Sequence, residues 1–118
     1  MTALIFDTET TGGDDPKMIE AAGIVLRPGD IDLRPADHFE FRYNPGIPST
    51  LGALATHHIL DSELVGCPPP NFVLPTDVEY LIGHNIDFDV QCLLANDIHI
   101  DETQRIDTHE LSRMLLAE

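Results

Sequence analysis

Residues 3–12 read Ala-Leu-Ile-Phe-Asp-Thr-Glu-Thr-Thr-Gly, a continuous apolar run that ends in polar residues. Such a run is typical of a strand buried inside a sheet, and it predicts a strand over residues 3–8. Asp7 and Glu9 stand at its end, two residues apart, so a strand would direct both carboxylates to the same side. Residues 11–16, rich in glycine and aspartate and ending in proline, have the composition of a turn.

Two further strands are predicted in the first half of the chain. Residues 18–26 read as a second strand, which Pro28 and Gly29 close. Residues 37–43 alternate between aromatic and polar side chains, which indicates a half-buried third strand. Its aromatic side is expected to contain Phe39, Phe41 and Tyr43. Three strands joined by turns predict an antiparallel meander.

The middle of the chain changes in character. Residues 49–56 are predicted as a short helix, with Pro48 ahead of it and Ser49 as the capping residue. Residues 61–64 predict a second short helix, and the proline-rich residues 66–75 a loop.

Two strand–helix units follow. Residues 80–83 predict a short strand that delivers His84 and Asn85 to its carboxyl end, with Asn85 as the cap of a helix over residues 86–96. The packed side of that helix is expected to contain Phe88, Cys92 and Ala95.

Residues 104–106 predict the last strand, followed at once by a helix. Asp107 and Glu110 have the spacing of a capping box, and the helix carries an apolar stripe. The pattern is still running at Glu118, so residues 1–118 are expected to be a single domain that is incomplete at its C-terminus. The stripe consists of Leu111, Met114 and Leu115.

The order of elements predicts an α/β fold, with a mixed sheet and flanking helices. Ligands of such sheets gather at the carboxyl ends of the inner strands. No apolar run reaches the roughly 20 residues that cross a bilayer, and the start of the chain has no basic signal region. We therefore expect a cytoplasmic protein with no membrane partner, and Cys67 and Cys92 as reduced thiols.

The charge is strongly acidic, because 21 Asp and Glu face only six Lys and Arg, a net charge of −15. Proteins that bind nucleic acid usually present a basic face, and these six residues form no cluster in the sequence. Divalent cations could supply the positive charge, basic surface could lie outside these residues, or the ligand could be something else. A simply acidic surface is the alternative.

Four acids at three places in the sequence are candidates for chemistry. Asp7 and Glu9 repel each other unless a cation lies between them, and hard ions such as Mg²⁺ or Mn²⁺ suit such oxygen ligands. A solvated strand end is the alternative for this pair. Asp89 falls one helical turn after Asn85, on the same side; the alternative is a capped helix with a surface acid. For Asp107, capping is preferred to metal binding.

The motifs resemble those of a known family. The stretch from Phe6 to Gly12 resembles the first motif of the DEDD-type 3′–5′ exonucleases, a family that includes the DNA polymerase III epsilon subunit, ribonuclease T and exonuclease X. Residues 81–89 resemble the second motif, and Ile106-Asp107-Thr108 resembles the strand that leads towards the third. Three other segments match in the same order, namely residues 19–22, 53–59 and 66–69.

The resemblance implies a ribonuclease H-like fold and hydrolysis of a terminal phosphodiester from the 3′ end of DNA or RNA. It implies two Mg²⁺ or Mn²⁺ ions in the complete site. Asp7 would bridge both ions, Glu9 would bind one and orient the water, and Asp89 would complete the acidic pocket. The residues predicted to contact the nucleic acid are Thr8, Thr10, Thr11, His57, Asn85 and Phe88.

The family's third motif supplies a fourth acid and a His or Tyr, and neither has a counterpart in residues 1–118. We therefore expect weak or no turnover, and an apolar patch where the helix of that motif would cover the sheet. The alternative is a non-catalytic remnant that binds nucleic acid or protein, with a partner or a second copy over this patch. DNA and RNA substrates, and roles in proofreading, repair or RNA processing, are left open.

Overall fold

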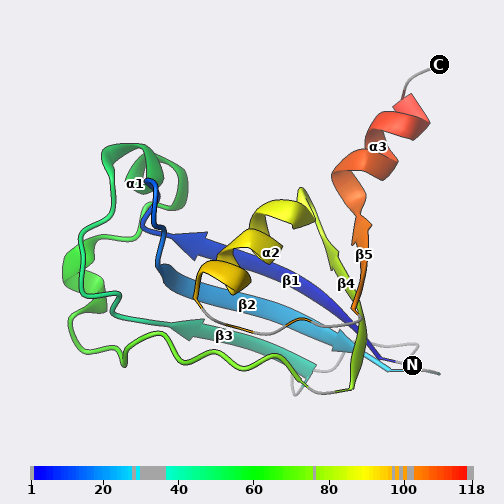
Figure 1. The fold of residues 1–118 in the computed structure, drawn as a ribbon, viewed down its shortest axis with the longest axis horizontal. Coiled ribbons are helices and arrows are strands. Elements are labelled where there is room, and N and C mark those ends of the chain that lie inside the picture. The colour runs from blue at the N-terminus through cyan, green and yellow to red at the C-terminus, as the bar shows by residue number, and fades with distance from the viewer. Residues whose placement is uncertain are drawn as a thin grey trace.

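The computed structural model describes residues 2–27, 29, 37–75, 77–96, 98, 100 and 103–116. A five-stranded sheet in the order β3-β2-β1-β4-β5 forms its centre (Figure 1). The β1–β2 and β2–β3 pairs are antiparallel, whereas β1–β4 and β4–β5 are parallel, as predicted for a meander continued by parallel strands. The strands are β1 (Thr2–Thr10), β2 (Met18–Leu26), β3 (His38–Arg42), β4 (Val78–Gly83) and β5 (Gln104–Asp107).

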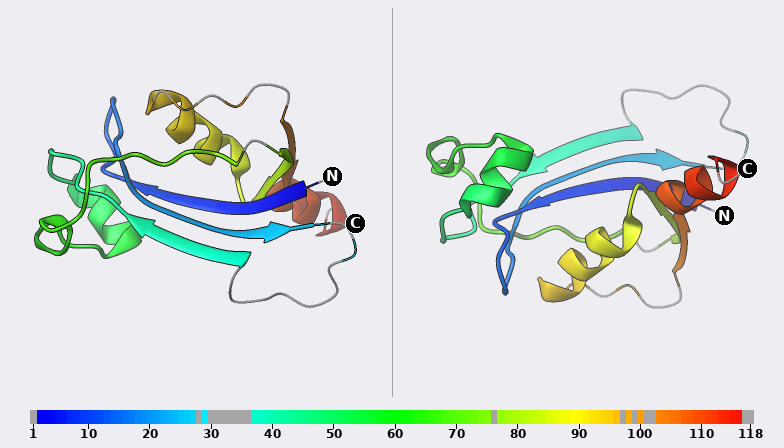
Figure 2. Two further views of the ribbon diagram at one scale, coloured as in Figure 1. Left: turned by 90° about the horizontal axis from the view of Figure 1, so that it is seen from below. Right: turned by 90° about the horizontal axis from the view of Figure 1, so that it is seen from above.

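The helices are distributed unevenly around this sheet. One face carries α2, a cluster of short helices lies beyond one end of the strands, and α3 continues from β5 away from the sheet (Figures 1 and 2). None of the described helices is long and apolar enough to cross a membrane. The helices are α1 (Leu51–His57), the 3-10 helix η2 (Asp61–Leu64), α2 (Ile86–Ala95) and α3 (Thr108–Leu116).

The main core lies between the sheet and α2. Alternate residues of β1 are buried there, including Leu4 and Phe6, and they pack with Leu81 of β4 and Leu93 of α2. The Phe6 ring also stacks on Phe72, which reaches the core from the loop before β4, with 5.2 Å between ring centroids. This packing fixes α2 against the centre of the sheet.

The opposite face of the sheet, here called the open face, is also apolar. Strand register places Ile24, Ile5, Ile82 and Ile106 directly beside one another across β2, β1, β4 and β5. All four side chains are half-exposed, and none of the described helices lies over them (Figure 2). A cavity of about 710 Å³ opens on this face. The expected apolar patch is therefore present.

Two helix caps differ from prediction. Thr50, not Ser49, caps α1, and its hydroxyl accepts a hydrogen bond from the Ala53 amide at 3.1 Å. Asn85 precedes α2 as predicted, but its backbone is left-handed with φ 62°, and its side chain makes no capping hydrogen bond. A left-handed residue cannot place its side chain as a usual cap in the extended region does.

The predicted packed side of α2 was wrong. Phe88 is 50% exposed and Ala95 is exposed, so only Cys92 of that set is buried. The helix instead buries residues at i, i+3, i+4 and i+7, which is the usual spacing of a packed stripe. These residues are Ile86, Asp89, Val90 and Leu93, with Cys92 beside them.

The last helix begins as predicted but packs differently. The Asp107 carboxylate accepts hydrogen bonds from the amides of His109 at 2.9 Å and Glu110 at 3.4 Å, which confirms its capping role. The predicted apolar stripe is present, yet every described side chain of α3 is at least partly exposed. The last residue in the predicted pattern, Glu118, lies outside the described residues.

Candidate active site

Asp7 and Glu9 lie near the carboxyl end of β1. Because β1 pairs with β2 on one side and β4 on the other, its backbone is held on both edges. The two residues share the open-face side of the strand, as their spacing predicts. Asp7 is exposed and lines the open-face cavity, whereas Glu9 is half-buried and lines a second cavity beyond the strand end.

Asp89 reaches β1 from the other side of the sheet. It is only 2% exposed, and its Oδ1 accepts hydrogen bonds from the amide of Thr8 at 2.9 Å and the hydroxyl of Thr8 at 2.6 Å. Thr8 is the residue between Asp7 and Glu9. The acid of the second motif is thus bound directly to the strand segment that carries the first.

Gly83 makes this approach possible. A Cβ atom at Gly83 would lie 2.8 Å from the Ile86 side chain and 3.0 Å from the carbonyl oxygen of Phe6. A side chain there would displace the end of the Ile86 side chain and crowd the backbone of β1, close to the Asp89 carboxylate.

Burial and mutual repulsion raise the pKa values of two of these acids. Burial raises the pKa of Asp89 to about 6; the two hydrogen bonds from Thr8 oppose this rise and the charge of Asp7 adds to it. Burial also raises the pKa of Glu9, and the nearby charges of Asp7, Glu20 and Asp89 raise it further. Carboxylates that disfavour each other's charge in this way fit a divalent cation, which would relieve the repulsion.

The acids do not form a ready-made metal cage. Among the described residues, no three His, Cys, Asp or Glu side chains are grouped so that they could hold a metal ion. The reason is visible in the strand, because Asp7 and Glu9 point to one side of β1 while Asp89 approaches from the other. The ligand atoms that these three acids offer to a metal are all carboxylate oxygens, which suit Mg²⁺ or Mn²⁺.

A second cavity, here called the Glu9 pocket, has a volume of about 430 Å³. Four of the residues predicted from sequence line it together, namely Glu9, Thr10, His57 and Phe88. Its size falls in the range of small-molecule sites, and its wall includes a half-exposed aromatic ring. The structure therefore brings an acid, a hydroxyl, an imidazole and a ring around one cavity.

Hydrogen bonding orients the imidazole of His57. Its Nδ1 accepts a hydrogen bond from the Ile59 amide at 2.9 Å, so in the neutral ring the proton lies on Nε2. Nε2 lies 3.4 Å from the hydroxyl of Ser49. His57 is thus a hydrogen-bond donor beside the pocket.

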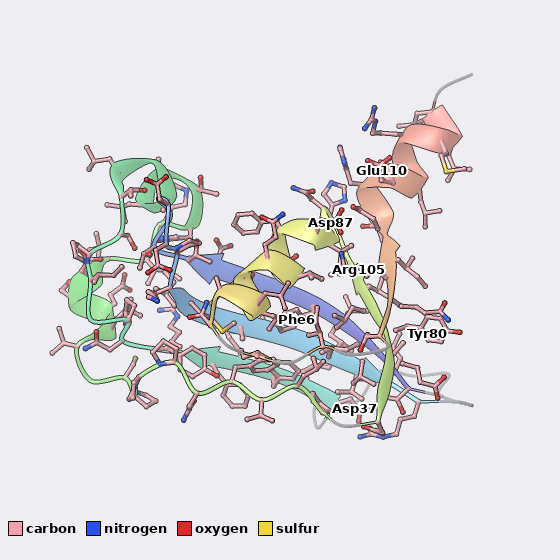
Figure 3. The ribbon with its side chains drawn as sticks, in the orientation of Figure 1. Phe6, Asp37, Tyr80, Asp87, Arg105 and Glu110 are labelled. Atoms are coloured by element: carbon pink, nitrogen blue, oxygen red, sulfur yellow. The ribbon has the colours of Figure 1, made fainter. Side chains whose placement is uncertain are left out.

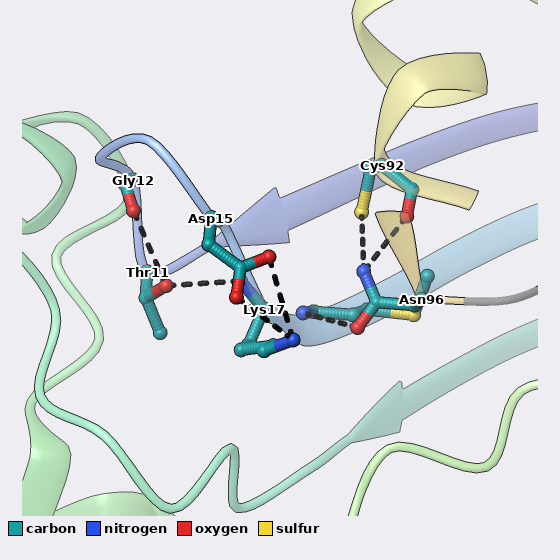
Figure 4. Close-up of polar contacts among 7 residues, drawn as sticks. Thr11, Gly12, Asp15, Lys17, Cys92 and Asn96 are labelled. Atoms are coloured by element: carbon teal, nitrogen blue, oxygen red, sulfur yellow. Dashed lines mark hydrogen bonds and ion pairs between the residues drawn. The ribbon is translucent and has the colours of Figure 1, made fainter. Parts of the chain in front are cut away.

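Thr11 holds the turn after β1. It is fully buried, and its amide donates to the Lys17 carbonyl at 2.9 Å. Its hydroxyl accepts from the Lys17 amide at 3.0 Å (Figure 4). In the same view, Asn96 at the end of α2 accepts a hydrogen bond from the Met18 amide at 3.2 Å. These contacts fasten the turn and α2 to β2, and a substrate contact by Thr11 stays a prediction.

The β4–α2 junction is joined to the β5–α3 junction. The backbone N–H of the exposed Asn85 donates to Asp107 Oδ1 at 2.9 Å. Asn85 lines neither of the two cavities. His84 Nδ1 lies 3.2 Å from the Thr108 hydroxyl, and His84 shares the open-face cavity with Asp7. Nearby, Asp87 and Arg105 form an ion pair at 3.0 Å (Figure 3).

Two features of the site were missed from sequence, and the sequence carried a signal for only the first of them. The spacing of Ile86, Val90 and Leu93 places Asp89 within the buried stripe, which excludes a surface acid. Gly12 and Thr50 form part of the Glu9 pocket; Gly12 lies in the turn after β1, and Thr50 is the residue that caps α1. No local pattern relates those two positions.

Comparisons with known proteins agree with this arrangement. The family model described as Exonuclease matches residues 4–118. The chain is 32% identical over 126 residues to the PolC-type DNA polymerase III of Latilactobacillus sakei subsp. sakei (strain 23K); the match covers 98% of the chain and 8% of that protein.

Solved structures show the same fold. Exonuclease X in complex with 5′ overhanging duplex DNA matches with a TM-score of 0.69 and 24% identity, over 97% of this chain and 64% of that one. E. coli exonuclease I in complex with a dA16 oligonucleotide matches with a TM-score of 0.74 and 18% identity, over 98% of this chain and 30% of that one. The chain thus spans only part of these relatives. With its ribonuclease H-like sheet and both acidic motifs in place, the chain belongs to the DEDD-type 3′–5′ exonuclease family.

Proposed function

We propose that this chain carries the metal-binding part of a 3′–5′ exonuclease site that acts on the terminal phosphodiester of DNA or RNA. One observation carries the proposal: Asp89 is buried against Thr8, the residue between Asp7 and Glu9. A buried carboxylate beside two others is costly unless hydrogen bonds or a bound cation compensate its charge. The proposed ligands are Asp7 and Glu9, with Asp89 adding its charge from the other side of β1.

Mg²⁺ or Mn²⁺ bound here would lower the pKa of a coordinated water and neutralise the phosphate. The residues of the chain supply the remaining functions. Thr8 fixes Asp89 through two hydrogen bonds. Glu9 lies near the other two acids and also lines the Glu9 pocket. We assign this pocket to the terminal nucleotide, with the His57 Nε2–H donating to it and the Phe88 ring packing on its base.

A bound cation would also explain how a strongly acidic chain binds nucleic acid. A chain with a net charge of −15 repels a polyanion. A divalent ion held by Asp7 and Glu9 would offset this repulsion locally, at the proposed place of hydrolysis.

Residues 1–118 are proposed to bind metal but to hydrolyse slowly. Loss of a general base typically reduces the rate by about 10²–10⁴. The resemblance assigns that base, and a fourth acid, to a third motif with no counterpart among these residues.

The test combines metal binding with nuclease assays. Calorimetric titration with Mn²⁺ should show binding that Asp7→Asn abolishes and Asp14→Asn preserves, because Asp14 is an exposed turn acid with the same charge change. Oligonucleotides labelled at the 5′ end, as DNA and as RNA, should shorten from the 3′ end slowly and only with metal. Undiminished Mn²⁺ binding by the Asp7→Asn variant would refute the assignment.

A non-catalytic binding role is the second candidate, and the open face favours it because its apolar row suits a protein partner. In that case the chain would bind its partner equally well with or without Mn²⁺. No shortening of either oligonucleotide at any Mn²⁺ concentration would support this candidate.

A further inference from the structure

A row of charged side chains runs across three strands beside the proposed metal site. Strand register places Glu9 of β1 directly opposite Glu20 of β2, and Glu20 directly opposite Arg42 of β3. Directly opposed residues of antiparallel strands have their side chains on the same face of the sheet and close together. The three side chains therefore share one side of the sheet, at the end of β1 that carries the acids.

Two members of this row carry the same charge. Carboxylates directly opposite each other destabilise an antiparallel pair of strands unless a cation compensates them. Burial and the charge of Asp7 raise the pKa of Glu9, and the charge of Glu20 raises it further. Glu20 is thus close enough to act on the charge of Glu9, and equally on a cation bound there.

The arginine of the row pairs with Glu20. Arg42 Nε donates to Glu20 Oε2 at 3.0 Å, and Arg42 Nη1 lies 4.0 Å from Glu63 Oε1. Glu63 is held in turn by its Oε2, which accepts a hydrogen bond from the Leu60 amide at 2.7 Å. Arg42 therefore compensates Glu20 from the side away from β1, and the Glu9 carboxylate stays available to a metal ion.

We propose that Glu20 is a fourth carboxylate of the metal site, which attracts the cation through space, and that Arg42 sets the strength of this attraction. The inference rests on the proposed function, because it requires a divalent ion at Glu9. Glu20 is not assigned as a ligand, since no three acids, histidines or cysteines of the described segments are grouped to hold an ion. Because their charges are opposite, Glu20 and Arg42 change the metal affinity in opposite directions.

Distance and exposure decide how large each effect is. Neighbouring strands lie about 4.8 Å apart, so Glu20 lies one strand from β1 and Arg42 about 10 Å away. These separations are comparable with the Debye length, about 8 Å at physiological ionic strength. The side chain of Glu20 is 18% exposed, against 38% for Arg42, so salt screens Glu20 less. We therefore expect Glu20 to have the larger effect.

Calorimetric titration of the complete 118-residue chain with Mn²⁺ tests the inference. Glu20→Gln keeps an oxygen that accepts from Arg42, and it should weaken binding about three- to tenfold, because the doubly charged ion loses a nearby negative charge. Arg42→Gln should strengthen binding about two- to fivefold, since the charge of Glu20 is then uncompensated. The double variant removes both charges and should bind within about twofold of wild type.

Two further measurements separate this effect from a structural role. Arg42→Lys retains the positive charge and should also bind Mn²⁺ within about twofold of wild type. The opposite shifts of the two single variants should shrink in about 1 M salt, because salt screens charges. If the pair acted only by joining β3 to β2, both single variants and the double variant would all weaken binding, and that result overturns the inference.

The ion pair between Arg27 and Asp37 is the matched control. It also joins the chain at β2 to the chain at β3, but at the far end of β2, about 24 Å from Glu20 at 3.4 Å per residue. Arg27→Gln and Asp37→Asn should leave the Mn²⁺ affinity unchanged. If wild type binds Mn²⁺ and Asp7→Asn does not, equal affinities in the Glu20 and Arg42 variants overturn this inference alone. A wild-type chain that binds no Mn²⁺ overturns it together with the proposed function.

Discussion

The helices α2 and α3 have the same origin in the chain but opposite surroundings. Each follows a parallel strand, α3 at once and α2 after two residues, and their starts are joined where the backbone N–H of Asn85 donates to Asp107 Oδ1. Yet α2 buries Leu93 completely, whereas Leu115 of α3 is 78% exposed. The more regularly amphipathic helix is the one whose apolar side chains stay exposed in the described chain.

The difference shows that an apolar stripe predicts that a helix can pack through that side, but it does not identify the surface against which the helix packs. The stripe of α2 contains a carboxylate, Asp89, and this helix still packs because Thr8 satisfies the acid. In α3 the stripe is wholly apolar, and capping at its first turn holds the helix instead. Packing stabilises the first helix and hydrogen bonds at one end stabilise the second.

The largest expected effect contrasts two leucines. Leu93→Ala should lower the free energy of unfolding by about 2–5 kcal/mol, because it leaves a cavity between α2 and the sheet. Leu115→Ala should change it by less than about 0.5 kcal/mol in the monomer, because that side chain is already in water. Urea denaturation at low protein concentration measures both, and equal losses would show that α3 packs against the chain.

The second prediction concerns the acid within the α2 stripe. In metal-free buffer, the raised pKa of Asp89 means that its stabilising contribution is full below about pH 4 and is lost as pH rises through about 6. Asp89→Asn keeps the oxygen that accepts from Thr8 and removes the charge. It should therefore stabilise the fold above pH 6, by at most about 3 kcal/mol.

The control for that prediction is Asp87→Asn, an exposed acid in the same helical turn. Thermal melts of both variants and the wild type from about pH 4 to pH 8 separate the effects. A constant difference between Asp89→Asn and wild type across this range would contradict the predicted titration. In excess Mn²⁺ the advantage of Asp89→Asn should shrink, since the proposed cation favours the charged acid.

The third prediction tests the capping of α3. Asp107→Ala removes the acceptor used by the amides of Asn85, His109 and Glu110. Amide hydrogen exchange in α3 should accelerate several-fold, because few other contacts hold this helix, while exchange in α2 should change little. Equal acceleration in both helices would show that the two junctions unfold as one unit.

The smallest effect concerns the start of α2. Asn85 has a left-handed backbone, which alanine tolerates poorly, so Asn85→Ala should cost about 1 kcal/mol. Asn85→Gly should stay within about 0.5 kcal/mol of wild type, since glycine adopts this conformation freely. If alanine proved as stable as glycine, the left-handed conformation at this position would be wrong.

Sequence reasoning succeeded where the chain's own periodicity carries the information. The strands, the meander and the positions of α2 and α3 were predicted from apolar runs and alternation, and the structure confirmed them. It failed for the packed side of α2, where Phe88 was expected inside and Ile86 was not considered. A helix with apolar residues on several sides leaves this choice to the sheet it meets.

The candidate site, too, was predictable from sequence only in part. The side shared by Asp7 and Glu9 follows from strand geometry alone, because successive side chains of a strand alternate. The burial of Asp89 against Thr8 joins residues 81 positions apart, and no local preference encodes that contact. The gathering of His57 and Phe88 around the Glu9 pocket also depends on how α1 and α2 lie relative to β1.

The sequence by itself determined which segments are strands and helices, and which acids share a side of β1, because both depend on interactions within a few residues. Only the tertiary structure decided that Asp89 is bound to β1 while the isoleucine row stays open and α3 extends outward. Those outcomes depend on strand register and on long-range packing, where the free energy comes from surfaces that distant segments bring together.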